Sequence, residues 1–458
     1  MQISTSLFQK YNIPVPRYTS YPPATAFHDE FTNADYREQI LKSNDAEPQN
    51  ISVYIHIPFC TQRCHFCGCN TALSQSEDRI KRYVNAVIKE IRTTAQHIDK
   101  KRLVTQVSWG GGTPNSIRME YIGEIMSALR SEFRFADFAE IAMECSPAYL
   151  DFGDVDYLHE TGFNRVSMGI QDFHPEVLNA INRRAPKHEV GEMLAYLKNK
   201  GFRGLNLDLV YGLPLQTVES FRENIQQIIA LQPDRLATFS YAHIPWFNKA
   251  QSLMEKHPFP SPEEKLQMLV DSINTMTANG YEVIGMDHFS KKDDELAIAK
   301  VNRQLHRNFQ GYNTLKTTGQ VYAFGASGIS QLNGAFAQNI KAYDKYIQAI
   351  ESVGFAVDRG YILNNEEIIV RDSINQIMCN GLLDFEQTAT KHGCSVDDFL
   401  KITKFNVSRI DQLLNDKLVE FKNNTLTVKP EGMLIVRNVA VAFDPAFTLK
   451  EGQYSNTL

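Results

Sequence analysis

The middle of the chain alternates between short apolar runs and longer amphipathic segments. Apolar residues recur every three or four positions in segments such as 77–98 and 218–232, which predicts helices. Between such segments lie runs rich in β-branched and apolar residues, at 51–57, 106–112, 140–146, 165–171, 204–214 and 235–245. Strands that alternate with helices predict a parallel sheet covered by helices. A seventh run, at 281–289, is placed to close or extend that sheet.

Each of the six predicted strands ends in polar residues or glycine. The first leads into a cluster of cysteines, and the second into the sequence GGGTP at 110–114. The other four carry Glu144, Gln171 with Asp172, Asp208 with Tyr211, and Tyr241 with His243. In parallel α/β barrels the active site is built from the carboxyl ends of the strands. These six ends therefore favour a curved, barrel-like sheet with one site over a flat sheet with one crevice.

The two ends of the chain have different patterns. Residues 1–48 are rich in proline and tyrosine, which predicts an extended arm rather than a helix or a core strand. After about residue 360 helical patterns follow one another, and a hairpin pattern occupies 418–428. No basic stripe accompanies them, so a packing domain is favoured over a DNA-binding one. We predict an arm at 1–48, a barrel domain at 49–350 and a helical, winged-helix-like domain at 351–458.

Composition narrows the class of protein. The chain has 458 residues, of which 43% are hydrophobic and 22% charged, as in ordinary globular proteins. The net charge of −6 does not favour a nucleic-acid partner recognised by bulk charge. Neither a secretory signal nor a membrane-spanning apolar run is recognisable, so we expect a cytosolic protein without a membrane partner. Heptads are also lacking, and we expect a monomer.

Four of the seven cysteines stand within ten residues, and their spacing is C-x3-C-x2-C-x-C. They are Cys60, Cys64, Cys67 and Cys69, in "YIHIPFCTQRCHFCGCN". Thiols in the cytosol stay reduced, so a soft metal is the favoured partner over disulfides. Structural zinc usually takes two separated C-x2-C pairs, and a redox C-x2-C motif would need only Cys64 and Cys67. An iron–sulfur cluster is the third alternative, and the spacing C-x3-C-x2-C resembles the radical S-adenosylmethionine (SAM) superfamily.

Cys69 is the unexplained member of the motif. In the radical SAM interpretation three cysteines hold three irons of a [4Fe-4S] cluster, and the fourth iron stays open for SAM. A fourth thiolate ligand would fill that position. We therefore expect Cys69 to lie beside the cluster or the substrate, or to be a packed thiol without a ligand role. The scattered Cys145, Cys379 and Cys394 are expected to be small buried side chains.

Several motifs together identify a family. The sequences "RYTSYP", "SWGGGTPN", "RVSMGIQDF", "NLDLVYGLP", "YAHIPW", "GMDHF" and "LHRNFQGY" accompany the cysteine motif. With them, residues 17–444 resemble the oxygen-independent coproporphyrinogen III oxidases (coproporphyrinogen dehydrogenases). Related haem chaperones share the catalytic domain, but typically lack the "GC" extension of the cysteine motif and the "RYTSYP" arm. Both features are present here, so the oxidase is favoured and the chaperone is the alternative.

The resemblance implies a fold, a reaction and cofactors. The fold would be a partial (β/α)6 TIM-like barrel with a helical C-terminal domain. The reaction would be the oxidative decarboxylation of two propionates of coproporphyrinogen III to vinyl groups, giving protoporphyrinogen IX in haem biosynthesis. A [4Fe-4S] cluster would generate a 5′-deoxyadenosyl radical from SAM, with a low-potential electron donor and an electron acceptor that the sequence does not identify. Two SAM molecules would bind side by side.

The resemblance also assigns site residues. The cluster ligands would be Cys60, Cys64 and Cys67. Contacts to the first SAM would come from Tyr54, Gly111, Glu144 and Ile329. Contacts to the second would come from Phe66, Gly112, Thr113, Gln171, Arg183, Asp208 and Ala242. The candidates for catalysis are Tyr54, Cys69 and Glu144.

Structural alternatives remain for these residues. Glu144 could be a salt-bridged carboxylate at a sheet end, Tyr54 a core aromatic, and Arg183 a surface arginine on a helix at 175–183. The four propionates of the substrate require cationic partners, for which Arg17 and Arg307 are candidates. We expect the N-terminal arm to contact the substrate or to cover the site.

Overall fold

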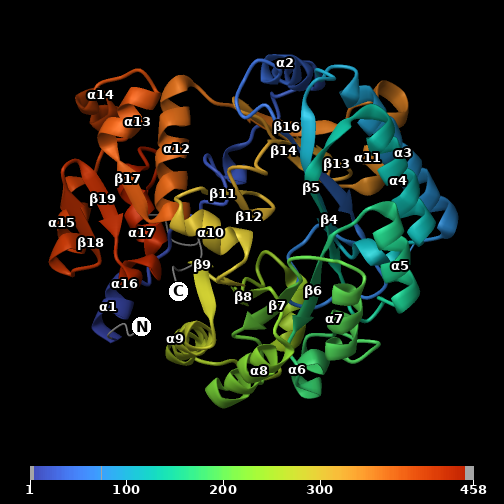
Figure 1. The fold of residues 1–458 in the computed structure, drawn as a ribbon, viewed down its shortest axis with the longest axis horizontal. Coiled ribbons are helices and arrows are strands. Elements are labelled where there is room, and N and C mark those ends of the chain that lie inside the picture. The colour runs from blue at the N-terminus through green and yellow to red at the C-terminus, as the bar shows by residue number, and fades with distance from the viewer. Residues whose placement is uncertain (1–4, 74, 449–458) are drawn as a thin grey trace. The chain divides into compact units, whose positions relative to one another are not determined.

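The computed structural model describes residues 5–73 and 75–448. The chain forms two compact units (Figure 1). The sheet unit comprises Phe27–Pro260 and Lys316–Ile362, and the helical unit comprises Met1–Ala26, Ser261–Leu315 and Leu363–Leu458. Each unit is thus built from segments that are distant in sequence. The three predicted segments do not coincide with these units, and the domain boundaries stay a prediction.

The six predicted strands all form in the sheet unit, and they are parallel. They are β1 (Ile51–Ile57), β4 (Leu103–Gly111), β5 (Arg134–Cys145), β6 (Arg165–Gln171), β7 (Asn206–Tyr211) and β8 (Arg235–Ser240). Each strand pairs with the next of these in the chain. This order is that of a (β/α)6 partial barrel, so the predicted α/β fold is confirmed.

Helices connect these strands and lie along the outer side of the sheet (Figure 1). They are α3 (Glu77–Ala95), α4 (Met119–Glu132), α5 (Phe152–Thr161), α6 (Pro175–Ala180), α7 (Val190–Asn199) and α8 (Val218–Leu231). In α3, Tyr83, Val84, Val87 and Ile91 recur on one face and are buried. The structure therefore confirms the helices predicted at 77–98 and 218–232. In α3 the apolar residues whose spacing indicated a helix form its buried face.

A second group of strands extends the sheet beyond β1. The strand β13 (Gln320–Phe324) pairs parallel with β1, and three antiparallel strands follow it. These are β14 (Ile329–Gln331), β15 (Ala335–Asn339) and β16 (Val357–Ile362), with α11 (Tyr343–Val353) between the last two. The strand β1 is consequently buried on both faces, as expected of a central parallel strand.

A buried carboxyl group, that of Glu90 in α3, ties this extension to the barrel. Glu90 is 2% exposed and accepts hydrogen bonds from the Gly325 backbone N–H (2.9 Å), Asn339 Nδ2 (2.7 Å) and the Tyr346 hydroxyl (2.6 Å). Burial raises the pKa of Glu90 to about 7, although the three bonds act in the opposite direction. The carboxyl group thus holds the turn that leads from β13 towards Ile329.

The raised pKa of Glu90 predicts a pH-dependent stability. An acid whose folded-state pKa lies above its unfolded value stabilises the fold at low pH, and this contribution is lost as pH rises towards about 7. The rise of this pKa from 4.5 to about 7 corresponds to a loss of up to about 3 kcal/mol in the free energy of unfolding. Urea unfolding between pH 5 and 8 should show a shallower pH dependence for Glu90→Gln than for the wild type. Identical slopes would contradict this role.

The N-terminal segment contains helices, and the prediction of an arm without helix is wrong. The structure has α1 (Thr5–Tyr11) and α2 (Asn33–Ser43), besides a short 3-10 helix at Ala24–Ala26. Thr32 and Asp35 form a reciprocal capping box at the start of α2, and Tyr36 and Ile40 are buried. This Thr-x-x-Asp signal is local and was readable in the sequence. Residues 12–22 between these helices form neither a helix nor a strand, and 19–22 are bends.

Between residues 281 and 314 the helical unit has two antiparallel hairpins. One pairs β9 (Tyr281–Gly285) with β10 (His288–Lys291), and the other pairs β11 (Leu305–Asn308) with β12 (Gly311–Thr314). The predicted seventh run, 281–289, therefore covers β9 and the start of β10 rather than one strand of another βα unit. The helices α9 (Pro262–Ala278) and α10 (Glu295–Val301) flank the first hairpin in sequence.

The C-terminal part of this unit has the predicted winged-helix-like arrangement of helices and a small sheet. The helices are α12 (Asn365–Asn380), α13 (Phe385–Lys391), α14 (Val396–Ile402), α15 (Val407–Asn415), α16 (Pro430–Met433) and α17 (Val436–Ala440), followed by a 3-10 helix at Val441–Phe443. The sheet joins β17 (Leu382–Asp384), β19 (Thr425–Val428) and β18 (Val419–Lys422). The hairpin turn uses Asn423 and Asn424 with φ of 49° and 55°, a conformation that asparagine tolerates.

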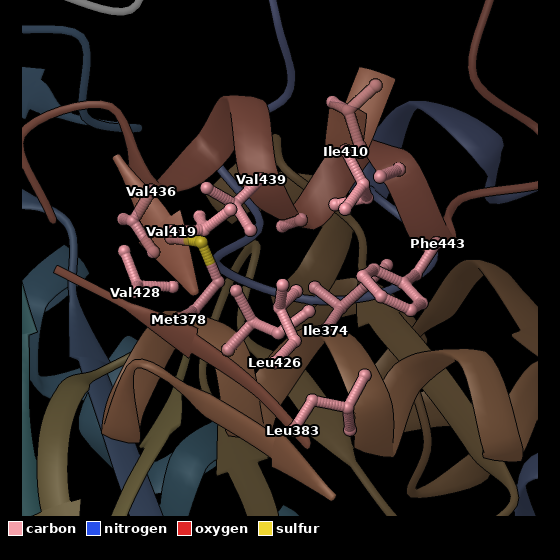
Figure 2. Close-up of a cluster of buried hydrophobic side chains, with 14 of the residues drawn as sticks. Ile374, Met378, Leu383, Ile410, Val419, Leu426, Val428, Val436, Val439 and Phe443 are labelled. Carbon is pink, nitrogen blue, oxygen red and sulfur yellow. The ribbon is translucent and has the colours of Figure 1, made fainter. Parts of the chain in front are cut away.

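An apolar core fills this C-terminal part. Figure 2 shows side chains of α12, the small sheet and α17 converging, with Ile374, Leu426 and Val439 among them. Cys379 is buried, as is Cys145 of the sheet unit, and Cys394 is half-buried, so their predicted packing role is confirmed. Within residues 5–73 and 75–448, no helix combines the length and apolar character needed to cross a bilayer.

Candidate active site

The cysteine loop begins at the carboxyl end of β1. Two short parallel strands, β2 (Phe59–Cys60) and β3 (Ala72–Leu73), close its base. The Cys60 thiol lies 3.5 Å from the Thr113 hydroxyl, and Arg183 Nη1 lies 3.5 Å from Cys64 Sγ. Burial raises the pKa of Cys60, and the charges of Cys67 and Cys64 raise it further. The three predicted ligands are thus close enough for their charges to act on one another.

These three thiols fit an iron–sulfur cluster. In the described part of the chain, no group of three or more His, Cys, Asp or Glu side chains is close enough to hold one metal ion. A four-iron cluster differs from a single ion, because each of its cysteines ligates a different iron. A hydrogen bond from Cys69 lowers the pKa of Cys67, and the charges of Arg63 and Arg183 act in the same direction. Burial raises the pKa of Cys64, and the positive charge of Arg183 opposes this by favouring the thiolate form that ligates iron.

Cys69 has a different environment from the other three cysteines. Its backbone N–H donates to Cys67 Sγ at 3.4 Å, and its side chain is exposed. The thiol of Cys69 also donates to Cys67, which lowers the pKa of Cys67 to about 6 and raises that of Cys69. In this pair Cys67 is the thiolate and Cys69 the proton donor. The arrangement supports the prediction that Cys69 lies beside a ligand without being one.

The glycine run after β4 is required by close contacts at each position. A Cβ on Gly110 would lie 2.8 Å from Glu144 Oε2, and one on Gly112 would lie 2.6 Å from the Pro58 carbonyl oxygen. Gly111 has a φ of +114°, and a Cβ there would lie 2.7 Å from the His56 ring. The Gly112 N–H donates to the Ile57 carbonyl at 2.8 Å and the Thr113 N–H to the Phe59 carbonyl at 2.9 Å. The run therefore holds the start of the cysteine loop against β4.

Glu144 stands at the end of β5 among other ionisable groups. Burial raises its pKa to about 7, the charge of Asp208 adds to this, and the Gly111 N–H opposes it by donating to the carboxylate. Water still reaches the side chain, although protein surrounds it closely. Burial raises the pKa of Tyr54, and the charges of Glu144 and Cys69 raise it further. Tyr54, Cys69 and Glu144, the predicted catalytic candidates, are thus brought together.

His56 belongs to this group and was missed in the sequence. Its Nε2 lies 3.1 Å from the Asn70 carbonyl oxygen and its Nδ1 lies 3.2 Å from the Tyr54 hydroxyl. Burial lowers its pKa to about 4, so the ring is neutral. A carbonyl only accepts, so Nε2 carries the proton and Nδ1 accepts from Tyr54. The available signal was a histidine two residues after Tyr54 in the same strand.

A second group forms along β6 and β7, around Asp208 in the middle of β7 and Gln171 at the end of β6. Asp208 accepts hydrogen bonds from the Ser167 hydroxyl at 2.9 Å and from Asn206 Nδ2 at 2.7 Å. Arg183 donates to the Gly169 carbonyl, and a Cβ on Gly169 would lie 2.6 Å from Gln171 Nε2. Since α6 ends at Ala180, Arg183 is not a surface arginine on a helix. It is half-buried and points at Cys64, which joins this group to the cysteine loop.

The remaining predicted residues lie around the same loop. Phe66 packs against the apolar cluster that contains Leu178 and Tyr241. After β8, a 3-10 helix at Lys249–Met254 places Gln251 so that its Nε2 donates to the Phe66 and Ala242 carbonyls, both at 3.3 Å. Asn248 Nδ2 donates to the Cys67 carbonyl at 2.9 Å. Ala242 is therefore linked to the loop through Gln251.

Ile329 is linked to the site only through its neighbours. It opens β14, two residues after Ser327, whose hydroxyl lies 3.4 Å from His56 Nε2. Ile329 itself pairs with Gln338 of β15. All the predicted site residues belong to the sheet unit. They form two groups joined at the cysteine loop, one containing Glu144 and one containing Asp208.

Comparison with known proteins agrees with this arrangement. Residues 54–228 match the radical SAM superfamily. The chain is 38% identical to the oxygen-independent coproporphyrinogen III oxidase of Synechocystis over 99% of its length and 97% of that protein. It is 37% identical to the Escherichia coli protein of the same name, over 96% and 94% of the two chains.

Comparison with solved structures gives the same result. The fold matches coproporphyrinogen III oxidase (HemN) from Escherichia coli, a radical SAM enzyme, with a TM-score of 0.89 and 35% identity. The match covers 98% of this chain and all of that one. Such identity over nearly the full length of both chains establishes membership. The chain belongs to the oxygen-independent coproporphyrinogen III oxidase family of radical SAM enzymes.

Proposed function

We propose that this protein decarboxylates two propionate side chains of coproporphyrinogen III to vinyl groups without oxygen, giving protoporphyrinogen IX in haem biosynthesis. The observation that carries the proposal is the gathering of Cys67, Cys69, Glu144 and Tyr54 at the end of β1, with Asp208 beside Glu144. Family membership supports the same substrate. The seven free cysteines suit the reducing cytosol that the sequence predicts.

The chemistry needs a radical because nothing makes the propionate β-carbon strongly acidic. Cys60, Cys64 and Cys67 would hold a [4Fe-4S] cluster, whose fourth iron stays open for SAM. When bound, these cofactors supply the 5′-deoxyadenosyl radical that removes one hydrogen atom from the β-carbon. Loss of CO2 and one electron from the substrate then leaves the vinyl group. An external donor reduces the cluster, and an external acceptor takes the electron from the substrate.

The residues of the first group would hold the SAM that reacts. Glu144 would accept hydrogen bonds from the amino group of this SAM, and Tyr54, Gly111 and Ile329 would complete its contacts. The neutral His56 holds Tyr54 and the Asn70 carbonyl at the end of the cysteine loop. Cys69 keeps a proton beside Cys67, and it is available to the substrate because its side chain is exposed.

The residues of the second group bind a second SAM. They are Phe66, Gly112, Thr113, Gln171, Arg183, Asp208 and Ala242. The two carboxylates Asp208 and Glu144 support the binding of two SAM molecules. They lie near enough to each other for the charge of Asp208 to raise the pKa of Glu144. SAM carries a positive sulfonium and an ammonium group, so one SAM at each carboxylate would relieve the repulsion between them.

An anaerobic assay tests the proposal. The purified protein should contain about four irons per chain with matching sulfide. With coproporphyrinogen III, SAM and a chemical reductant it should release CO2 and form protoporphyrinogen IX. Zinc in place of iron would contradict the cluster. Tight haem binding without any turnover would contradict the oxidase and favour the haem chaperone instead.

A further inference from the structure

Three arginines from distant parts of the chain come together inside the helical unit. They are Arg17 in the N-terminal segment, Arg307 in β11 and Arg437 in α17. Arg437 Nη2 donates to the Val15 carbonyl at 2.9 Å, two residues before Arg17. Burial lowers the pKa of Arg437, and the positive charges of Arg17 and Arg307 lower it further. Arg17 and Arg307 therefore each lie near enough to Arg437 for their charges to act on it.

Further titratable groups lie around these arginines. Lys265 of α9 adds a cation, and burial together with the charge of Arg17 lowers its pKa to about 8. Asp287 is buried, which disfavours its charge, but His288, Arg307 and Arg17 outweigh burial and lower its pKa. Asp444 accepts a hydrogen bond from the Tyr18 hydroxyl at 2.8 Å, and burial raises its pKa. Lys265 thus adds a cation near Arg17, and Asp287 a carboxylate near Arg17 and Arg307.

The segment that carries Arg17 is fixed by hydrogen bonds of its neighbours, whereas the Arg17 side chain itself takes no part in them. Tyr18 is bonded to Asp444, and Asn438 Nδ2 donates to the Tyr11 carbonyl at 3.0 Å. Both bonds fix the segment against the C-terminal part of the same unit. The Arg17 side chain is exposed, and within residues 5–73 and 75–448 it makes no hydrogen bond or ion pair. Its guanidinium donors are therefore available to a ligand.

Arg307 is held in place by contacts that leave part of its guanidinium unsatisfied. The group lies over the Tyr312 ring, 5.2 Å from its centroid, and Nη1 lies 3.3 Å from Met286 Sδ. Tyr312 is opposite Arg307 in the hairpin, and its ring lies 5.2 Å from that of His288. Nε of Arg307 is buried and has no hydrogen-bond partner among the described residues. A sulfur atom is a weak acceptor, so a stronger anionic acceptor would be favoured here.

We propose that Arg17, Arg307 and Arg437 of the helical unit form a subsite for the propionate carboxylates of the substrate. The proposal rests on the proposed function, which supplies a tetracarboxylate substrate. Clustered cations in a partly buried place are costly, and a bound carboxylate lowers that cost. The planar fork of arginine also matches a carboxylate with two parallel hydrogen bonds.

Binding of coproporphyrin III, the stable oxidised form of the substrate, tests the subsite directly. The tetra-acid and its uncharged tetra-amide are titrated into the anaerobic holoenzyme, and the dissociation constants are measured by absorbance. Arg17→Gln and Arg307→Gln should each weaken binding of the tetra-acid by about tenfold or more and leave that of the tetra-amide unchanged. Arg307→Lys should recover only part of the loss, because lysine keeps the charge but not the fork.

The controls separate the subsite from the proposed function. Arg92→Gln removes one exposed arginine from α3 and should bind both porphyrins as the wild type does. The KM of Arg17→Gln for coproporphyrinogen III should rise more than its kcat falls. Unchanged tetra-acid binding in both variants, with an active wild type, overturns the subsite alone. A wild type that neither binds the tetra-acid nor turns over coproporphyrinogen III overturns the proposed function as well.

Discussion

Cys64→Ser should abolish iron binding and SAM cleavage, whereas Cys69→Ser should keep about four irons per chain. Cys64 is a predicted ligand that lies beside the Arg183 guanidinium, and serine is a poor ligand for iron. Cys69 donates to Cys67 through its N–H and its thiol, so its removal leaves all three ligands in place. Iron and sulfide analysis of anaerobically purified proteins measures the difference.

Cys394→Ser is the matched control, because this half-buried cysteine belongs to the helical unit. It should retain both iron and activity. The same experiment reports on Cys69 itself, since a Cys69→Ser protein with a full cluster but little product formation would place the thiol on the substrate side. Loss of iron from Cys69→Ser to the extent seen for Cys64→Ser would refute the assignment of three ligands and one donor.

Gly112→Ala should reduce SAM cleavage by about a hundredfold. A Cβ at this position meets the Pro58 and Phe59 carbonyl oxygens at 2.6 and 2.8 Å, and both belong to the backbone. The start of the cysteine loop, which includes Cys60, must then move away from β4. A displacement of about 1 Å in a reacting arrangement costs about a hundredfold in rate. Formation of 5′-deoxyadenosine under reducing anaerobic conditions measures the effect.

Gly153→Ala serves as its control, because nothing lies within 4 Å of a Cβ there and the residue is in α5. This variant should cleave SAM at the wild-type rate and be more stable by up to about 1 kcal/mol, as expected for alanine in a helix. A Gly112→Ala enzyme with wild-type SAM cleavage would mean that the loop does not depend on its close approach to β4.

Local patterns in the sequence were sufficient for the parallel part of the fold. Each of the six apolar runs predicted between 51 and 245 is a strand. The spacing of apolar residues and the turn residues that bound a run are local signals, because they depend on a single element and the face that it buries. The cysteine spacing and the polar residues after each strand also located the site, because the carboxyl ends of neighbouring parallel strands meet. The signal for helix α2 was equally local, because the Thr32–Asp35 capping box marks its first residue.

Packing between segments that are distant in sequence decided the features of the fold and of the candidate site that local patterns did not predict. The antiparallel strands β14 to β16 are short, and the neutral state of His56 depends on burial by residues far along the chain. The helical unit joins three separate segments, so the meeting of Arg17 with Arg437 has no signature in either neighbourhood. Arg183 could be read as a surface residue until the turn after α6 directed it at Cys64. By itself the sequence determined the parallel strands and their helices between residues 51 and 245, and it indicated the candidate site residues. Burial and charge depend on what the folded chain brings close, and only the tertiary structure decided them.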